Sequence, residues 1–203
     1  MPTSNMGERI RAERERQGIS LRALARDVGV SASMISQIEN GKSRPSVSTL
    51  YAITTALGLP MQDVFAVDNL SGPAPPTSVL GALGAARGIR LGPHVRPKER
   101  QILTLDSGVT WERLGSLPPL DVDFLQITYA PGGSSSSSGE LMRHPGWEYG
   151  YLVSGNLVLT LGFDEIVLEA GDAVSFDSTT PHCYRNESSE PAVGIWFVIQ
   201  QQT

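Results

Sequence analysis

The chain has 203 residues, of which 40% are hydrophobic, and a formal charge of −5. This length allows two small domains with packed cores, and the acidic balance excludes a protein that binds nucleic acid over its whole surface. The charge is uneven, however: residues 1–46 carry eight Lys and Arg against five Asp and Glu, whereas residues 71–203 carry eight against fourteen. A basic N-terminal end on an acidic body predicts DNA binding by that end only.

Two features of the sequence bear on its compartment. Cys183 is the only cysteine, which excludes a disulfide within the chain and fits a reducing cytoplasm. The charged N-terminus has no apolar core for a signal peptide, and no apolar run approaches the roughly 20 residues that span a bilayer. We therefore expect a cytoplasmic protein with no membrane partner.

The N-terminal third has the spacing and the caps of five short helices. Apolar residues recur at helical intervals, and Ser20 and Ser31 precede the second and third helices as N-caps. Ser46 or Ser48 starts the fourth helix, and a short fifth helix follows. The prediction is an all-α domain over residues 1–68.

Within this domain, residues 21–39 form two helical segments joined by a tight turn. Small Ala25 lies where the second helix must pack closely, and Gly29 permits the turn. This is the pattern of a helix-turn-helix motif. Residues 8–66 resemble the Cro/C1-type (xenobiotic-response-element) family throughout, which implies that Ser31–Glu39 is the recognition helix in the major groove.

The resemblance also implies which residues contact DNA. Gln37 is the main candidate for base recognition, because its amide can pair bidentately with adenine. The set is completed by the outward face of the helix and by flanking phosphate contacts, namely Ser20, Arg22, Ser31, Ala32, Ser33, Ser36, Asn40, Lys42 and Arg44. The alternative is an ordinary solvated helix surface. Glu39 is expected to pair or cap within the domain.

The composition changes after the helices. Residues 69–94 are rich in Pro and Gly and predict an extended, semi-rigid linker. From residue 95 to 203, short segments alternate apolar and polar residues with a period of two and are separated by Gly, Pro and Asp, which predicts a sandwich or closed barrel. The serine tract at 134–138 is expected at a loop tip.

Two segments of this β-rich half resemble the two motifs of the cupin family. GELMRHPGWEYGYLVSG has His144, Glu148 and Gly155 at the positions of the first motif, and GDAVSFDSTTPHCYRN has His182 and Asn186 at those of the second. Two of the three histidines in the chain thus fall at metal-ligand positions of the family. The resemblance implies a C-terminal all-β cupin domain, a double-stranded β-helix or jelly-roll barrel.

Met142 stands where the first histidine of the cupin motif is expected, and a thioether is a poor ligand for hard divalent ions. His144, Glu148 and His182 remain as a two-His-one-carboxylate set, which suits one divalent metal ion, iron or zinc. The other interpretation is a metal-free pocket in which these groups bind an organic effector. Tyr149 and Tyr151 alternate with other residues on the same predicted strand and are expected in the same effector pocket.

The two domains together predict a regulator that binds a double-stranded DNA operator as a homodimer and senses a small-molecule effector in the barrel. The same pair of domains is similar to the iron-dependent hydroxypropylphosphonate epoxidase, so a metal-dependent cupin oxidoreductase is the alternative. Basic Lys42 and Arg44 after an intact motif favour the regulator, because catalysis alone does not need them. A cupin that serves only for dimerisation is a third interpretation.

Overall fold

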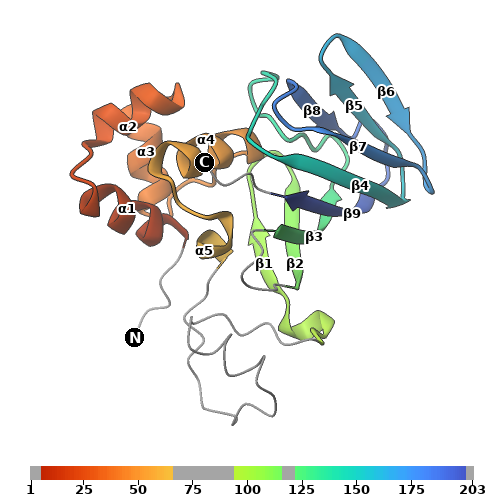
Figure 1. The fold of residues 1–203 in the computed structure, drawn as a ribbon, viewed down its shortest axis with the longest axis horizontal. Helices are drawn as coiled ribbons and strands as arrows, with labels where there is room; N and C mark the ends of the chain where they lie inside the picture. The colour runs from red at the N-terminus through yellow and green to blue at the C-terminus, as the bar shows by residue number, and fades with distance from the viewer. Residues whose placement is uncertain (1–5, 66–93, 116–121, 200–203) are drawn as a thin grey trace.

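The computed structural model describes residues 6–65, 94–115 and 122–199 (Figure 1). The predicted linker over residues 69–94 lies outside the described residues, except for His94. In the described ranges, no helix has both the length and the apolar character needed to cross a membrane.

The N-terminal part is all-α and contains the five predicted helices. Their bounds are α1 Met6–Arg16, α2 Leu21–Val28, α3 Ala32–Glu39, α4 Val47–Leu57 and α5 Met61–Phe65. Ser20, Ser31 and Ser46 cap α2, α3 and α4, because each hydroxyl accepts the backbone N–H three residues further on. Gly29 ends α2 with a φ of 79°, a left-handed conformation that glycine adopts without strain. The five-helix prediction is confirmed, and Ser46, not Ser48, starts α4.

A buried ion pair joins α1 to α3. Arg14 Nε and Nη2 donate to the two carboxylate oxygens of Glu39 at 2.6 and 2.9 Å, and Arg14 Nη1 donates to the carbonyl of Ile19 at 2.9 Å. The side chains of Arg14 and Glu39 are 9% and 3% exposed. The hydrogen bond to Glu39 outweighs burial and raises the pKa of Arg14 above its ordinary value. Glu39 therefore holds the helical domain together, as the sequence predicts, and does not face DNA.

The C-terminal part is all-β in the described ranges and begins with a short 3-10 helix, η1 Pro97–Glu99. The strands are β1 Gln101–Thr104, β2 Val109–Gly115, β3 Val122–Tyr129, β4 Trp147–Ser154, β5 Leu157–Leu161, β6 Asp164–Leu168, β7 Ala173–Asp177, β8 His182–Arg185 and β9 Ala192–Ile199. They form two antiparallel sheets, one in the order β1-β2-β3-β9-β4-β7 and one in the order β6-β5-β8. Such pairing of sequence-distant strands across two sheets is that of a jelly roll, so the cupin prediction is confirmed.

The serine tract at 134–138 is only in part the loop tip that the sequence suggests, where Ser137 and Ser138 are exposed. Ser135 and Ser136 are buried. The Ser135 hydroxyl donates to Cys183 Sγ at 3.5 Å and accepts from the backbone N–H of Tyr184 at 3.0 Å. Small side chains are needed here because the chain passes directly over β8. A sequence pattern based on polarity alone does not reveal this packing.

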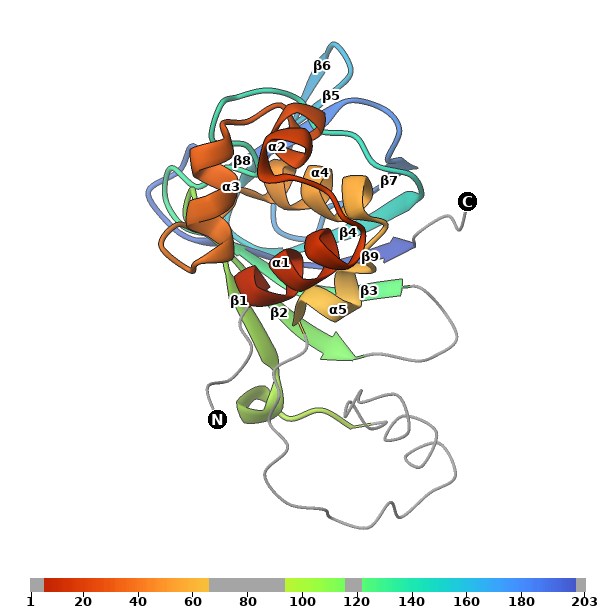
Figure 2. The ribbon, with the colours of Figure 1, turned by 90° about the vertical axis from the view of Figure 1, so that its left-hand side faces the viewer.

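The helical domain docks against the barrel through α4, which lies between the other helices and the strands (Figures 1 and 2). Two backbone hydrogen bonds cross the boundary at the start of α4. Ser48 N–H donates to the carbonyl of Ser135 at 2.9 Å, and Asp106 N–H donates to the carbonyl of Pro45 at 2.9 Å. Both bonds hold α4 at the edge of the barrel.

Aromatic side chains extend this contact. Trp111 of β2 is 1% exposed and contacts two rings of the helical domain. The ring centroids of Tyr51 from α4 and Phe65 from α5 lie 5.9 and 6.1 Å from the centroid of Trp111. The buried apolar side chains of the two domains consequently form one continuous core.

Candidate functional site

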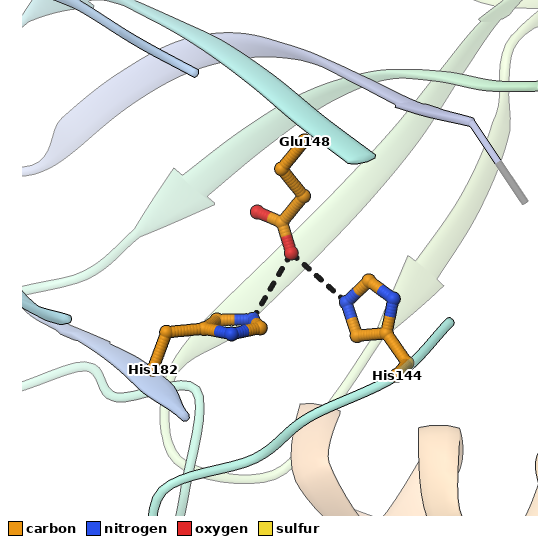
Figure 3. A group of neighbouring side chains, drawn as sticks. All are labelled: His144, Glu148 and His182. Carbon is orange, nitrogen blue, oxygen red and sulfur yellow. Dashed lines mark hydrogen bonds and ion pairs between the residues drawn. The ribbon is translucent and has the colours of Figure 1, made fainter. Parts of the chain in front are cut away.

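Three buried polar side chains meet inside the barrel (Figure 3). Glu148 lies on β4 of the larger sheet, His182 begins β8 of the smaller sheet, and His144 lies in the segment that leads into β4. Each is at most 3% exposed, and their ligand atoms all lie within 4.8 Å of one another. Paired backbone hydrogen bonds between Met142 and His182 hold the two segments together. The structure therefore brings together the three residues that the cupin motifs single out.

One carboxylate oxygen of Glu148 faces both imidazoles. Its Oε1 lies 2.9 Å from Nε2 of His144 and 3.0 Å from Nε2 of His182 (Figure 3). The ring of His182 is oriented through its other nitrogen, because Nδ1–H donates to the carbonyl of Thr180 at 2.8 Å. In the neutral ring the lone pair is then on Nε2, and this buried atom has no properly directed hydrogen-bond partner in the described part of the chain. Nε2 of His182 therefore faces the Glu148 carboxylate and, in the neutral tautomer, carries the lone pair that a metal ion would bind.

The second carboxylate oxygen of Glu148 is held by Tyr184, a residue that the sequence analysis missed. The Tyr184 hydroxyl donates to Glu148 Oε2 at 3.3 Å and accepts the indole N–H of Trp196 at 3.3 Å. Tyr184 follows His182 by two residues on β8, so the strand period of two places both on one face. That periodicity is the signal that could have identified it.

The charge of the cluster follows from burial and from these contacts. Burial alone would raise the pKa of Glu148, but the hydrogen bond from His144, the contact with His182 and the charges of the two imidazoles lower it to about 2. Burial would lower the pKa of His182, but Glu148 raises it above its ordinary value. Burial raises the pKa of Tyr184 well above its ordinary value, so its phenol is a neutral donor. The carboxylate is therefore ionised at neutral pH and needs positive charge beside it.

The donor set fits one divalent metal ion. Two imidazole nitrogens and one carboxylate oxygen converge, which is the arrangement that non-haem iron uses and that zinc accepts. His182 has the oriented tautomer that metal-binding histidines require, with Nδ1–H on a backbone carbonyl. Met142, which is 8% exposed, lies in the wall of the same cavity as Glu148. It forms an apolar wall there, as its chemistry predicts.

Tyr149 and Tyr151 do not lie in this pocket, and the prediction for them is wrong. They are 49% and 50% exposed on the outer face of β4, whereas Glu148 and Gly150 are buried on its inner face. The reason is the strand period of two: the phase that turns Glu148 inward turns both tyrosines outward.

The barrel cavity is closed by the helical domain. A free volume of about 10 Å³ remains beside Glu148, with Val47 and Tyr51 of α4 in its wall. Tyr51 is 5% exposed, and its ring is parallel to the imidazole of His144, with centroids 4.1 Å apart and planes 3° apart. The sequence analysis missed Tyr51. The available signal was a second stripe on α4, because Val47, Tyr51 and Thr54 recur at helical spacing and are all buried.

The DNA-binding candidates lie on or next to α2 and α3 (Figures 1 and 2), and the chain that follows α3 returns to the barrel at Pro45. Gln37, Lys42 and Arg44 are exposed, and no ion pair within the described ranges engages the two cations. Asn40 differs, because its amide donates to the carbonyl of Ser36 at 2.7 Å and caps its own helix. Of the others, Ser20, Arg22, Ser31 and Ser33 are exposed, and Ala32 and Ser36 are half-buried.

Comparisons with known proteins agree with these two domains. A helix-turn-helix family matches residues 10–64, and a cupin domain family matches residues 125–198. The chain is 28% identical over 199 residues to the HTH-type transcriptional regulator PuuR of Escherichia coli, which covers 97% of this chain and 94% of that protein. It is 28% identical over 173 residues to the HTH-type transcriptional regulator SutR of the same organism, covering 85% of this chain and 82% of that protein.

The fold of the whole chain is similar to a solved structure. The crystal structure of an HTH_3 family transcriptional regulator from Vibrio cholerae aligns with 97% of this chain and 96% of its own, with a TM-score of 0.65 and 21% identity. The chain thus has a helix-turn-helix domain and a cupin domain, as a transcriptional regulator like PuuR and SutR.

Proposed function

We propose that the protein binds its operator as a homodimer and that its cupin domain binds a small-molecule effector which alters operator binding. His144, Glu148 and His182 hold one divalent metal ion, iron or zinc, in the effector site. One observation carries the proposal for the barrel: an ionised carboxylate buried at 3% exposure faces two imidazole nitrogens. The two imidazole nitrogens and the carboxylate oxygen converge within 4.8 Å, so the site is suited to a cation.

The two functions are divided between domains whose proposed limits are residues 1–68 and 95–203, with a linker over 69–94. The family matches at 10–64 and 125–198 fall within the first and third of these ranges. The dimer is proposed because one recognition helix contacts too few base pairs for a specific site, and two related half-sites about 10 bp apart, or a multiple of that, supply the rest.

A metal-dependent oxidoreductase is the alternative function, because the same three side chains could serve catalysis. The exposed Gln37, Lys42 and Arg44 support the regulator, since a purely catalytic protein has no use for them. Selection of binding sites from a random double-stranded DNA library distinguishes the two. The regulator enriches one two-fold symmetric sequence, whereas the enzyme enriches none.

Replacing Gln37 by Ala should weaken binding to the selected operator by about 1–3 kcal/mol and relax the preference at one base pair, because a bidentate amide contact is lost. The measurement is a fluorescence-anisotropy titration on the operator and on its single-base variants. Unchanged affinity and preference would show that α3 does not contact the bases through Gln37.

The matched controls for this variant are Lys42→Ala and Arg44→Ala. Both residues are exposed cations placed to contact phosphates, so each change should weaken binding to all sequences alike and reduce the slope of log K against log salt by about one unit. A loss of base preference in these variants would contradict the division between base and phosphate contacts.

Replacing Glu148 by Gln should weaken metal binding by more than about 100-fold, because even the loss of an outer-shell partner costs about 10–100-fold. The variant should still bind the operator, but metal should no longer change its affinity. Elemental analysis of the purified protein and operator titrations with and without Zn²⁺ or Fe²⁺ measure both effects.

Glu190→Gln is the control for that variant, since Glu190 is an exposed carboxylate on the same domain. It should behave as the unmodified protein. If Glu148→Gln kept a full metal or effector response, the sensory pocket would lie elsewhere, and a cupin that serves only for dimerisation would be favoured.

A further inference from the structure

The inner site of the cupin barrel is built from both domains. Most of its wall comes from strands β2, β3, β4, β8 and β9, but Val47 and Tyr51 belong to α4 of the helical domain. The Tyr51 ring covers the imidazole of His144 at 4.1 Å in a parallel stack and contacts Trp111 edge-on. One aromatic side chain of the DNA-binding domain therefore covers one of the three candidate ligands of the barrel.

The volume behind Tyr51 decides what can be bound while α4 is docked. About 10 Å³ is free beside Glu148, which is room for an ion or one water molecule. Pockets for organic ligands have volumes of about 300–1,000 Å³. The barrel in this conformation thus admits a metal ion and excludes a metabolite.

A larger space lies directly outside. A cleft of about 410 Å³ separates the helical domain from the barrel, with Ser48, Thr49 and Ala52 of α4 on one side and the segment 137–143 on the other. Met142 lines both this cleft and the inner cavity. The cleft therefore reaches the same Met142 wall that closes the inner cavity.

Of the groups that fill the barrel, the Tyr51 ring is the one that can leave. The strand residues are fixed by the ladder hydrogen bonds of two sheets. The start of α4 is held to the barrel by the two backbone bonds of Ser48 and Pro45, and the rest of the docking consists of side-chain packing and the bond from Arg113 to the carbonyl of Gln62. A movement of α4 as a body would withdraw the ring without breaking the barrel.

We propose that Tyr51 determines which ligands the cupin site takes: an ion while α4 is docked, and an organic ligand only in exchange for the Tyr51 ring. This inference rests on the proposed sensory function of the barrel. The ligand class is a small planar ring with a hydrogen-bond donor or a positive charge, because it takes the place of a phenol stacked on His144 and beside the carboxylate of Glu148.

The exchange couples the ligand to DNA binding. Helix α4 packs against α1 and α2, and the chain between α3 and α4 contains Lys42 and Arg44. A ligand that occupies the place of Tyr51 selects conformations in which the helical domain has left its docked position. In a dimer this changes the spacing of the two recognition helices.

The test uses the purified full-length chain and phenol as the probe, since phenol is the ring that Tyr51→Ala removes. We expect Tyr51→Ala to bind phenol at least about tenfold more tightly than the unmodified protein, which binds only through its undocked fraction. Tyr51→Phe, which keeps the ring, should bind as weakly as the unmodified protein. The Tyr51→Leu variant, in which the change in volume is smaller, should also bind phenol more tightly than the unmodified protein. It replaces the Ala variant in the test if that variant does not fold. Titration calorimetry measures the affinities.

Two outcomes would overturn the inference: equal phenol affinity in the unmodified protein and in a folded Tyr51→Ala or Tyr51→Leu variant, or tight binding that persists when Glu148→Gln is added. Tyr149→Ala, at an exposed ring outside the barrel, should change nothing. If the proposed function itself is wrong, a different result is expected. In that case the tighter phenol binding is found, but neither phenol nor metal alters the affinity of the protein for its operator.

Discussion

Replacing Glu39 by Ala should lower the free energy of unfolding of the helical domain by about 3–5 kcal/mol, which is the cost of leaving a buried charge without its main partner. Arg14 and Glu39 form a two-point hydrogen-bonded pair with side chains 9% and 3% exposed, and this pair joins α1 to α3. The guanidinium cannot lose its proton at accessible pH, so it must keep its charge when the carboxylate is gone. Urea denaturation followed by far-ultraviolet circular dichroism measures the change.

Two controls separate the buried charge from a general effect of mutation. Arg11→Ala breaks the ion pair of Arg11 with Glu15, whose side chains are 53% and 52% exposed, and should cost less than about 1 kcal/mol. Replacing Arg14 and Glu39 together by Leu removes both charges and should recover most of the loss. If Glu39→Ala cost no more than Arg11→Ala, the pair would not be essential to the packing of α3.

Replacing Trp111 by Ala should lower the free energy of unfolding by about 3–5 kcal/mol, because the change leaves a large cavity at the junction of the two domains. Trp111 is 1% exposed and packs against the rings of Tyr51 and Phe65. The loss should affect the barrel and the docking of the helical domain together. Calorimetric unfolding of the full chain, with limited proteolysis to detect undocking, measures both.

Trp111→Phe is the matched control for that prediction. The indole nitrogen of Trp111 is buried without a hydrogen-bond partner among the residues described, so the indole acts through its shape and not through a polar contact. Phenylalanine keeps much of the ring and should cost less than half as much as alanine. An equal loss in both variants would show that the indole nitrogen has an essential partner.

The local structure was predictable from short-range patterns, and the ligand cluster was predictable from the resemblance to the two cupin motifs. A serine before a helix accepts the N–H three residues on, wherever the helix later packs, so Ser20 and Ser31 were identified correctly as caps. Likewise, the spacing of His144 and Glu148 around one turn places both inside a jelly roll once that fold is recognised.

The errors came from residues whose role depends on which face is buried or on the other domain. Alternation along the strand predicts that some of its aromatic residues face inward, but the inward phase of Glu148 excludes Tyr149 and Tyr151. The second stripe of α4 marks Tyr51 as buried, but its contact with His144 could not be predicted from sequence, because the two residues lie in different domains and are more than ninety positions apart in the chain. Local patterns carry no information on such packing.

The two apolar stripes of α4 have an evolutionary consequence. Leu50 and Ile53 complete the core of the helical domain, while Val47 and Tyr51 complete the wall of the barrel. A substitution on this one helix therefore affects the packing of two cores at once. Regulators built in this way cannot exchange their DNA-binding and cupin domains as independent modules, and α4 must change together with the barrel that it closes.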